Sequence, residues 1–156
     1  MKVFLTFCPL ILTLSALGKG GVDSAYLAGE WKCHQEFQLS DSVIFSASHT
    51  SKYSLSSDTV VSNGIITTYL INKPGTKSVL QVQFHSHYSI DELEVTFKPY
   101  EIEATVLENG LGDLTEEFVD GFMQHKVESS ADLLLIDESN FHLKYRNGTS
   151  AECLRA

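Results

Sequence analysis

Two histidines separated by one residue come closest, in this sequence, to the pattern of a metal site. His85 and His87 flank Ser86 in a segment of alternating apolar and polar residues. In a β-strand, side chains two residues apart point to the same side, so both imidazoles could contact one ion. A zinc site needs at least one more protein ligand, which His34 or His142 would have to supply. Because His85 and His87 fall on the polar side of their strand, we interpret them as solvated residues and expect no metal and no cofactor.

Two glutamates have the spacing of a catalytic carboxylate pair. Glu101 and Glu103 also share one side of a predicted strand, and paired carboxylates can perform acid–base chemistry. The residues that alternate with them are apolar, which is typical of a strand with a solvated outer side, and nothing in the sequence forces a raised pKa. Motifs of serine hydrolases, dinucleotide-binding proteins, P-loop proteins and zinc proteases are absent from the sequence. We therefore expect a protein that is not an enzyme.

The charge balance argues against two classes of partner. The chain has 156 residues, the size of one domain, with 11 Lys and Arg against 20 Asp and Glu, and a formal net charge of -9. Nucleic acids and anionic membrane surfaces bind clustered basic side chains, so we expect neither as a partner. Apolar residues make up 43% of the chain, enough to build a packed core.

Residues 1–18 have the three-part pattern of a secretory signal peptide. Lys2 is followed by an apolar run from Val3 to Leu14, and Ala16 and Gly18 are small residues at positions -3 and -1 of a cut after Gly18. The run is shorter than the roughly 20 residues that span a bilayer, and an uncleaved anchor is the alternative interpretation. We expect an exported chain that does not span the membrane after cleavage.

The cysteines divide between this segment and the rest of the chain. Cys8 lies in the apolar run, which leaves Cys33 and Cys153 near the two ends of the mature chain. In an exported protein this arrangement favours a disulfide, and the alternative is two buried free thiols. No C-x-x-C pair supports a zinc knuckle or a redox motif.

Alternation of apolar and polar residues predicts strands along most of the mature chain. The Ser-rich stretch 51–61 is the least regular part of this pattern. Asn63-Gly64 and Asn147-Gly148 predict two-residue hairpin turns, because Asn and Gly tolerate positive φ. Two further reversals are predicted at residues 73–75 and 138–140. The predicted strands include residues 31–39, 80–88, 93–97, 102–106, 131–136, 141–146 and 149–154.

One segment has helical periodicity instead. Asp113 and Glu116 have the spacing of a capping box, and they begin a predicted amphipathic helix over Asp113–Val127. We expect its apolar side to pack against the sheet. That side would carry Leu114, Phe118 and Phe122, with Val119 and Met123 beside them.

About eight strands in sequence order can close into a barrel, which removes the exposed edges of an open sheet. The first and last strands are then antiparallel neighbours, and the residue numbers of opposite partners have a constant sum. If Cys33 lies opposite Cys153, then Trp31 lies opposite Arg155 on the same face. We therefore predict a cation–π contact between Arg155 and the indole of Trp31.

The ends of this pattern resemble a known family. Gly29-Glu30-Trp31 resembles the Gly-x-Trp sequence that opens the first strand of lipocalin-type barrels, where a basic residue of the last strand covers the Trp. The wider pattern of Gly-x-Trp-x-Cys, a helix in the second half and a final Cys-x-Arg is similar to exported bacterial lipocalin-like proteins of uncharacterised function. The resemblance implies a mainly β, up-and-down, lipocalin-like β-barrel over residues 26–156 with one amphipathic helix. It also implies a periplasmic location, with the extracellular space as the alternative.

Two functions fit this expectation. The leading hypothesis is a binding protein whose barrel interior holds a small apolar ligand. We expect inner faces that are nearly all apolar, which leaves no converging polar groups for a hydrolase. The second hypothesis is a non-catalytic structural or interaction module of the envelope, with a filled barrel, an exposed apolar patch and a protein partner that the sequence does not specify. The candidate ligand-contacting residues are Phe37, Phe84, Tyr88, Phe97 and Tyr145.

Overall fold

The structure, a computed structural model, describes residues 24–124 and 126–156. The predicted signal segment, residues 1–18, lies outside the described residues. The described chain begins with a short 3-10 helix, η1 (Ser24–Tyr26), and has one α-helix, α1 (Asp113–Gln124), between its fifth and sixth strands. The strands are β1 (Gly29–Ser40), β2 (Val43–Ser54), β3 (Thr59–Leu70), β4 (Lys73–Asp91), β5 (Glu94–Asn109), β6 (Ser129–Asp137), β7 (Asn140–Tyr145) and β8 (Ser150–Arg155).

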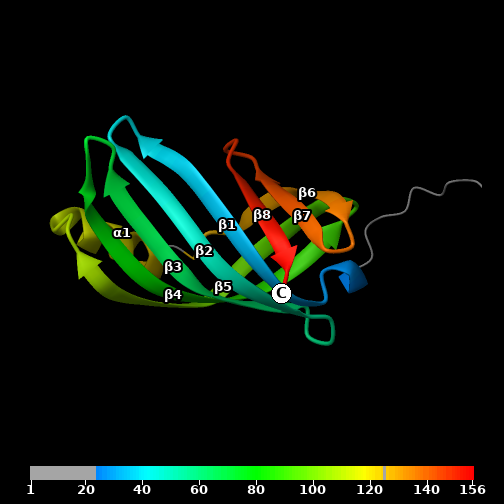
Figure 1. Cartoon of the computed structure of the whole chain (residues 1–156). Coiled ribbons are helices and arrows are strands. Elements are labelled where there is room, and N and C mark those ends of the chain that lie inside the picture. Colours follow the sequence, from blue (N-terminus) through cyan, green and yellow to red (C-terminus); the bar gives the residue numbers. More distant parts are fainter. Residues whose placement is uncertain (1–23, 125) are drawn as a thin grey trace, which may run out of the picture.

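The strands form one closed sheet (Figure 1). Each strand pairs antiparallel with the next in sequence, and β8 returns to pair with β1, so the ring has no free edge strand. The prediction of a mainly β, up-and-down arrangement of eight strands with one helix in the second half is confirmed. Among the described residues, no helix is both long and apolar enough to cross a membrane.

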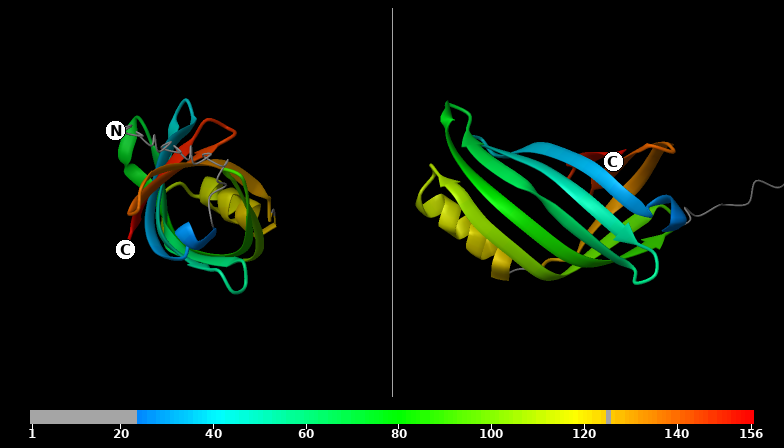
Figure 2. Two further views of the ribbon diagram at one scale, coloured as in Figure 1. Left: turned by 90° about the vertical axis from the view of Figure 1, so that its right-hand side faces the viewer. Right: turned by 60° about the horizontal axis from the view of Figure 1, so that its bottom comes forward.

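The ring is complete at one end and open on one side at the other. β5 pairs with β6 only over Glu94–Phe97, while its remainder pairs with β4 as far as Asn109. In the same way, the described pairing of β1 with β8 stops at Gln35, although β1 continues along β2. Helix α1 lies at this open end, and η1 lies at the opposite, complete end (Figures 1 and 2).

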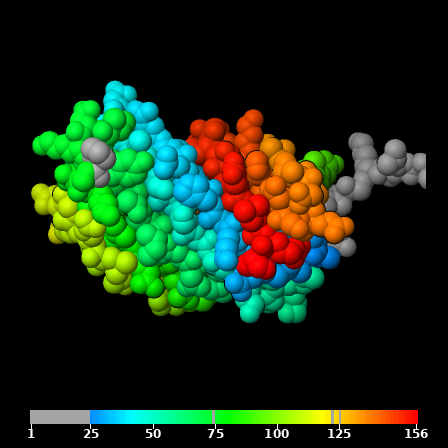
Figure 3. All heavy atoms as spheres, viewed as in Figure 1, coloured from blue at the N-terminus to red at the C-terminus, as the bar shows by residue number. Residues whose placement is uncertain are grey.

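The seam between the first and last strands has the predicted register. Cys33 lies opposite Cys153 and forms a disulfide with it, and Trp31 lies opposite Arg155. The guanidinium of Arg155 lies 4.2 Å from the centre of the Trp31 ring, which is the predicted cation–π contact. Figure 3 shows β8, in red, packed beside β1, in blue, so the two ends of the described chain meet at this seam.

Trp31 and Arg155 also hold η1 over the complete end of the ring. The fully buried indole of Trp31 donates a hydrogen bond to the carbonyl of Leu27 at 2.9 Å, and its ring packs edge-on against Phe141. The guanidinium of Arg155 donates hydrogen bonds to three backbone carbonyls. These belong to Tyr26, Ala28 and Glu138. One side chain of β8 thus joins the N-terminal segment to the turn between β6 and β7.

The prediction of a turn at Asn63-Gly64 is wrong. Both residues lie inside β3, where Gly64 pairs with His49 of β2 and Val82 of β4. A Cβ atom at Gly64 would lie 2.4 Å from the Cβ atom of His49, so glycine is required by a close approach and not by a turn. The chain reverses at residues 41–42, 55–58 and 71–72 instead.

The other predicted turns have mixed outcomes. Asn147-Gly148 does join β7 to β8, with Gly148 at a φ of 85°, and residues 138–139 join β6 to β7. The reversal predicted at residues 73–75 occurs at residues 71–72, and β4 has already begun at Lys73. A register shift after Tyr69 accommodates the extra residues at the start of β4.

Helix α1 begins at Asp113 as predicted, ends at Gln124, and packs only part of its predicted apolar side against the core. Thr115 is buried, and its hydroxyl and that of Ser78 on β4 share a 2.5 Å hydrogen bond. Phe118 and Val119 pack against the core, whereas Leu114 is exposed. The hydroxyl of Ser78 on β4 lets the polar Thr115 occupy the buried side of the helix. The apolar stripe alone therefore did not predict which residues of α1 are buried. Met123 is also exposed, and the side chain of Phe122 lies outside what the structure describes.

Candidate functional site

The interior of the ring is divided between two apolar clusters. The η1 cluster surrounds Trp31 at the complete end, and the α1 cluster surrounds Phe45 and Leu80 at the open end, where Phe118 of α1 joins it. A cavity of about 610 Å³ reaches residues of both clusters. The interior is therefore not filled by side chains, although each end of it is packed.

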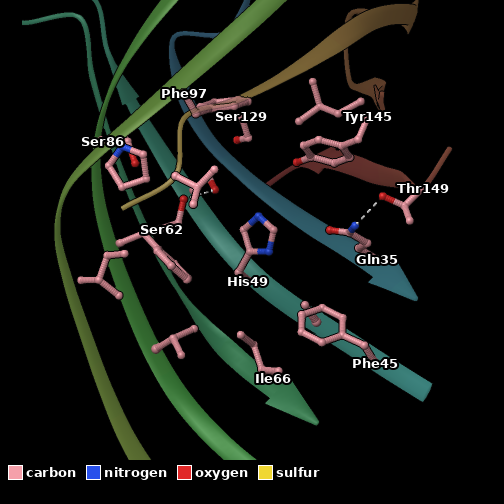
Figure 4. A pocket seen from close by; sticks show the side chains of 18 of the residues that line it. Gln35, Phe45, His49, Ser62, Ile66, Ser86, Phe97, Ser129, Tyr145 and Thr149 are labelled. Atoms are coloured by element: carbon pink, nitrogen blue, oxygen red, sulfur yellow. Dashed lines mark hydrogen bonds between the residues drawn. The ribbon is translucent and has the colours of Figure 1, made fainter. Parts of the chain in front are cut away.

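Three of the five aromatic residues predicted to contact a ligand line this cavity. Phe84 projects from β4, Phe97 from β5 and Tyr145 from β7. The other two, Phe37 and Tyr88, pack beside the cavity wall. Opposite strands thus contribute aromatic rings to one apolar space (Figure 4).

Two aromatic residues that the prediction did not single out connect these groups. Phe45 lines the cavity, and its ring lies 4.7 Å, centre to centre, from that of Phe37. Tyr53 also lines the cavity and packs edge-on against Tyr88 at 5.2 Å. Phe37 and Tyr88 therefore support the wall through Phe45 and Tyr53. The alternation of Phe45, Ala47 and Tyr53 on one side of β2 is a sequence signal that could have identified both lining residues.

The expectation of a nearly all-apolar inner face is wrong. Polar side chains from five strands and from the turn before β8 line the middle of the cavity, and we call them the polar belt (Figure 4). The polar belt consists of Gln35, His49, Ser51, Ser62, Ser86, Ser129 and Thr149. Its members on β2 and β3 fall in the Ser-rich stretch of the chain or next to it. Small polar residues weaken the alternation of hydropathy, which is why the sequence pattern left this wall unassigned.

Four side chains of the polar belt form two hydrogen-bonded pairs. The side-chain amide of Gln35 donates to the hydroxyl of Thr149 at 3.1 Å, and the hydroxyls of Ser51 and Ser62 share a 2.6 Å hydrogen bond. These two pairs tie β1 to the turn before β8, and β2 to β3, from inside the ring. They also satisfy groups whose burial would otherwise cost free energy.

His49 differs from these pairs. Its imidazole projects into the cavity from β2 and has no hydrogen-bond partner among the residues that the structure describes (Figure 4). Burial lowers the pKa of His49 below its ordinary value near 6.5, and the neighbouring His34 lowers it further. The imidazole is therefore neutral at pH 7, with one donor and one acceptor nitrogen.

The tyrosines of the wall are also uncharged at neutral pH. Burial raises the pKa of Tyr145 and that of Tyr53, whose pKa is raised further by Tyr145 and Tyr88. Glu117 of α1 is the one formally charged residue among the described residues that line the cavity, and it is exposed to solvent. The interior surface is thus polar in its middle but electrically neutral.

Four of the five exposed residues of the described lining mark the mouth of the cavity, and the fifth, Ile65, lies on β3. Glu117 and Gly121 of α1, together with Val127, lie on one side, and Asn147 in the turn between β7 and β8 lies on another. These are the segments that flank the gap where β5 departs from β6 and β1 departs from β8. Access to the interior is therefore from the side of the ring, beside α1.

The histidines considered as metal ligands lie on the outer face of the sheet and do not point toward a common site. The side chain of His85 makes a 2.6 Å hydrogen bond with that of Gln83, and the ring of His87 packs against Tyr100 at 4.8 Å. His34 lies on the outer side of β1, where its Nδ1 and the hydroxyl of Ser48 are 2.9 Å apart. Among the described residues, no group of three or more His, Cys, Asp or Glu is placed to hold a metal ion.

The remaining candidate groups also lie outside. His142 lies on β7, between Leu134 of β6 and Glu152 of β8 in the register. Glu101 and Glu103 are exposed on the outer side of β5, and the buried Ile102 between them faces inward. Both carboxylates are therefore solvated and lie outside the cavity.

Comparisons with known proteins do not assign a family. No protein-family model matches the chain, and no curated protein matches its sequence. The geometry of the cavity therefore carries the functional argument.

Proposed function

We propose that this protein is an exported binding protein that holds a small, largely apolar molecule inside a lipocalin-like barrel. The observation that carries the proposal is the cavity of about 610 Å³. Its volume falls within the range of roughly 300–1,000 Å³ that is usual for small-molecule sites. Its aromatic and aliphatic lining, interrupted by a few polar groups, is the composition that such sites have.

Export rests on two features of the chain. The signal-like residues 1–18 and the disulfide between Cys33 and Cys153 both favour an oxidising compartment. We propose the periplasm, with the extracellular space as the alternative. N-terminal sequencing of the protein recovered from the exporting cell tests this part, because the proposal requires a mature chain that begins at Lys19. A chain that begins at Met1 would contradict it.

The second hypothesis, a structural or interaction module, requires a filled interior. The cavity favours the binding protein over this module, since a packed barrel would have placed side chains in the same space. Aliphatic residues do lie exposed on the outer sides of β6 and β8, among them Leu134, Ile136 and Leu154. Single exposed apolar residues are common on proteins and need no partner.

A hydrocarbon fluorophore tests whether the cavity takes up apolar molecules. We suggest pyrene, whose emission changes when it leaves water, titrated with the mature protein. Ala47 faces the cavity from β2, so Ala47→Trp places an indole in the binding space. Ser46 directly precedes Ala47 and faces outward. Ser46→Trp therefore adds the same indole outside the ring and serves as the matched control.

We expect the wild-type protein and Ser46→Trp to bind pyrene with similar affinity, and Ala47→Trp to lose most of it. Circular dichroism would show whether Ala47→Trp folds. If it does not, Gly121→Trp blocks the mouth from exposed helix surface instead. The proposal fails if folded wild-type protein does not bind pyrene, or if all three proteins bind it equally.

A further inference from the structure

His49 occupies a built position inside the cavity. On the neighbouring strand it faces Gly64, where any side chain would collide with it, since an added Cβ atom would lie 2.4 Å from both the Cβ of His49 and the carbonyl oxygen of Ser48. Glycine weakens a strand interior, so its presence in the middle of β3 has a cost. Glycine at this position allows the close approach of β2 at Ser48 and His49.

The hydrogen-bonding capacity of His49 is unused within the described structure. Two pairs of belt residues satisfy each other, Gln35 with Thr149 and Ser51 with Ser62. The two nitrogens of His49 have no described partner, although they lie where an apolar molecule would exclude water. A buried polar group without a partner costs free energy, so a ligand that completes this bond is favoured over one that does not.

The charge of the lining limits the ligand further. The described residues that line the cavity include no Lys and no Arg, and the exposed Glu117 at the mouth is their single carboxylate. A carboxylate ligand would enter without a counter-ion and pass a like charge. An ammonium ligand would leave Glu117 behind in solvent and be desolvated among neutral groups. Burial of an unpaired charge is costly, so a neutral ligand fits this interior best.

We propose that His49 is the specificity-determining residue of the cavity and that it selects an uncharged amphiphile, an apolar body with a hydroxyl group that hydrogen-bonds to the imidazole. This inference rests on the proposed binding function and adds the chemical class of the ligand. The neutral imidazole can accept the hydroxyl proton through one nitrogen or donate to the hydroxyl oxygen through the other. The hydroxyls of Ser86 and Ser129 keep the surrounding belt polar without adding charge.

Three probes with the same apolar chain test the selection. Decanol, decanoate and decylamine would be compared at pH 7 for their ability to displace pyrene from the mature protein. We expect decanol to displace pyrene at a concentration at least about tenfold lower than either charged probe, because only decanol enters without an unpaired charge. A tighter complex with decanoate or decylamine would overturn the inference and name the other ligand class.

Two substitutions assign the selection to His49. His49→Phe keeps an aromatic ring in the cavity without a hydrogen-bonding atom, and we expect it to weaken decanol binding about five- to tenfold, the effect of one hydrogen bond. Pyrene, which has no hydrogen-bonding group, should bind His49→Phe at least as tightly as the wild type, because the variant removes the polar group that pyrene would leave unpaired. His49→Gln restores a donor and an acceptor and should recover most of the decanol affinity.

The outcomes separate this inference from the proposed function. If pyrene binds and decanol affinity is the same in wild type and His49→Phe, the role of His49 is refuted while the binding function stands. If pyrene does not bind, the binding function itself fails. If His49→Phe does not fold, His49→Leu removes the same hydrogen-bonding atoms, and decanol affinity equal to that of the wild type in this variant would refute the role of His49.

Discussion

Reduction of the disulfide between Cys33 and Cys153 tests whether the seam closes the sheet. The two residues are 120 positions apart, so the bond restricts nearly the whole described chain when it is unfolded. For a loop of this length, loop-closure entropy corresponds to about 5 kcal/mol at 25 °C. The free energy of unfolding of a domain is about 5–15 kcal/mol in total, so reduction should remove a large share of the stability.

The bond matters because the pairing it fixes is short. β1 and β8 pair only between Trp31 and Gln35 in the described structure, with the disulfide in the middle. Without the bond, this stretch and the contacts of Arg155 must hold the ring closed. Antiparallel pairing over only five residue pairs contributes little stability by itself. We therefore expect closure of the sheet to depend on the disulfide.

Urea unfolding measures the effect. Trp31 is the single tryptophan of the sequence and is fully buried beside the seam, so its fluorescence reports opening at this place, and circular dichroism reports the whole sheet. We expect the phosphine-reduced protein to unfold with a free energy about 5 kcal/mol lower than the oxidised protein. The slope of the transition should also rise, because the reduced unfolded chain exposes more surface.

The control is the variant Cys33→Ala/Cys153→Ala, whose stability should not respond to the reductant. A difference below about 1 kcal/mol between oxidised and reduced wild-type protein would refute the reasoning, since the strands would then close without the bond. An equal response of the alanine variant would show that the reductant acts elsewhere.

The remaining predictions concern three residues. Arg155→Met removes the cation–π contact with Trp31 and three hydrogen bonds to backbone carbonyls. We expect thermal unfolding to show a free energy of unfolding about 2 kcal/mol lower than that of the wild type. A decrease below about 0.5 kcal/mol would contradict this role. Gly64→Ala forces a Cβ atom against His49, and chemical unfolding should show a free energy of unfolding about 2 kcal/mol lower than that of the wild type. Because the pKa of His49 is lower in the folded than in the unfolded protein, the unfolded state binds more protons between that lowered value and about pH 6.5. The stability contributed by neutral His49 is therefore complete above about pH 6.5 and is lost as the pH falls through the lowered pKa. Pyrene affinity should fall only below that lowered pKa, where the folded protein itself takes up the proton. The titratable groups around His49 are His34, Tyr53, Glu117 and Tyr145. Since His49→Phe removes the titrating imidazole and leaves these groups in place, a pyrene titration of this variant with the same pH profile as wild type would assign the effect to one of them.

The sequence predicted the parts of the fold that depend on local pattern and on chemistry between the chain ends. Pairing Cys33 with Cys153 sets the register of the seam, and that register alone is enough to place Arg155 over Trp31, where the structure has it. Alternation identified strands, and the capping pattern identified the start of α1 at Asp113.

The features that sequence missed depend on distant partners. Asn-Gly occurs three times: it forms a turn at Asn147-Gly148, follows the end of β5 at Asn109-Gly110, and lies inside a strand at Asn63-Gly64. The difference is the close approach of β2 at Ser48 and His49, which are distant in sequence and lie beside Gly64 in the sheet. The polar belt was missed for a related reason. Its serines bond across strands, as Ser51 and Ser62 do, and such pairing satisfies a buried hydroxyl that looks solvent-exposed in the sequence pattern.

The central claim is that the interior of this protein is a binding site, and equilibrium dialysis against pyrene tests it most directly because it counts bound molecules in solution. We predict one pyrene per chain for the wild-type protein and for Ser46→Trp, and a small fraction of that for Ala47→Trp, whose added indole occupies the cavity. Equal uptake by all three proteins would place the pyrene outside the cavity, and no uptake by the wild-type protein would contradict the account.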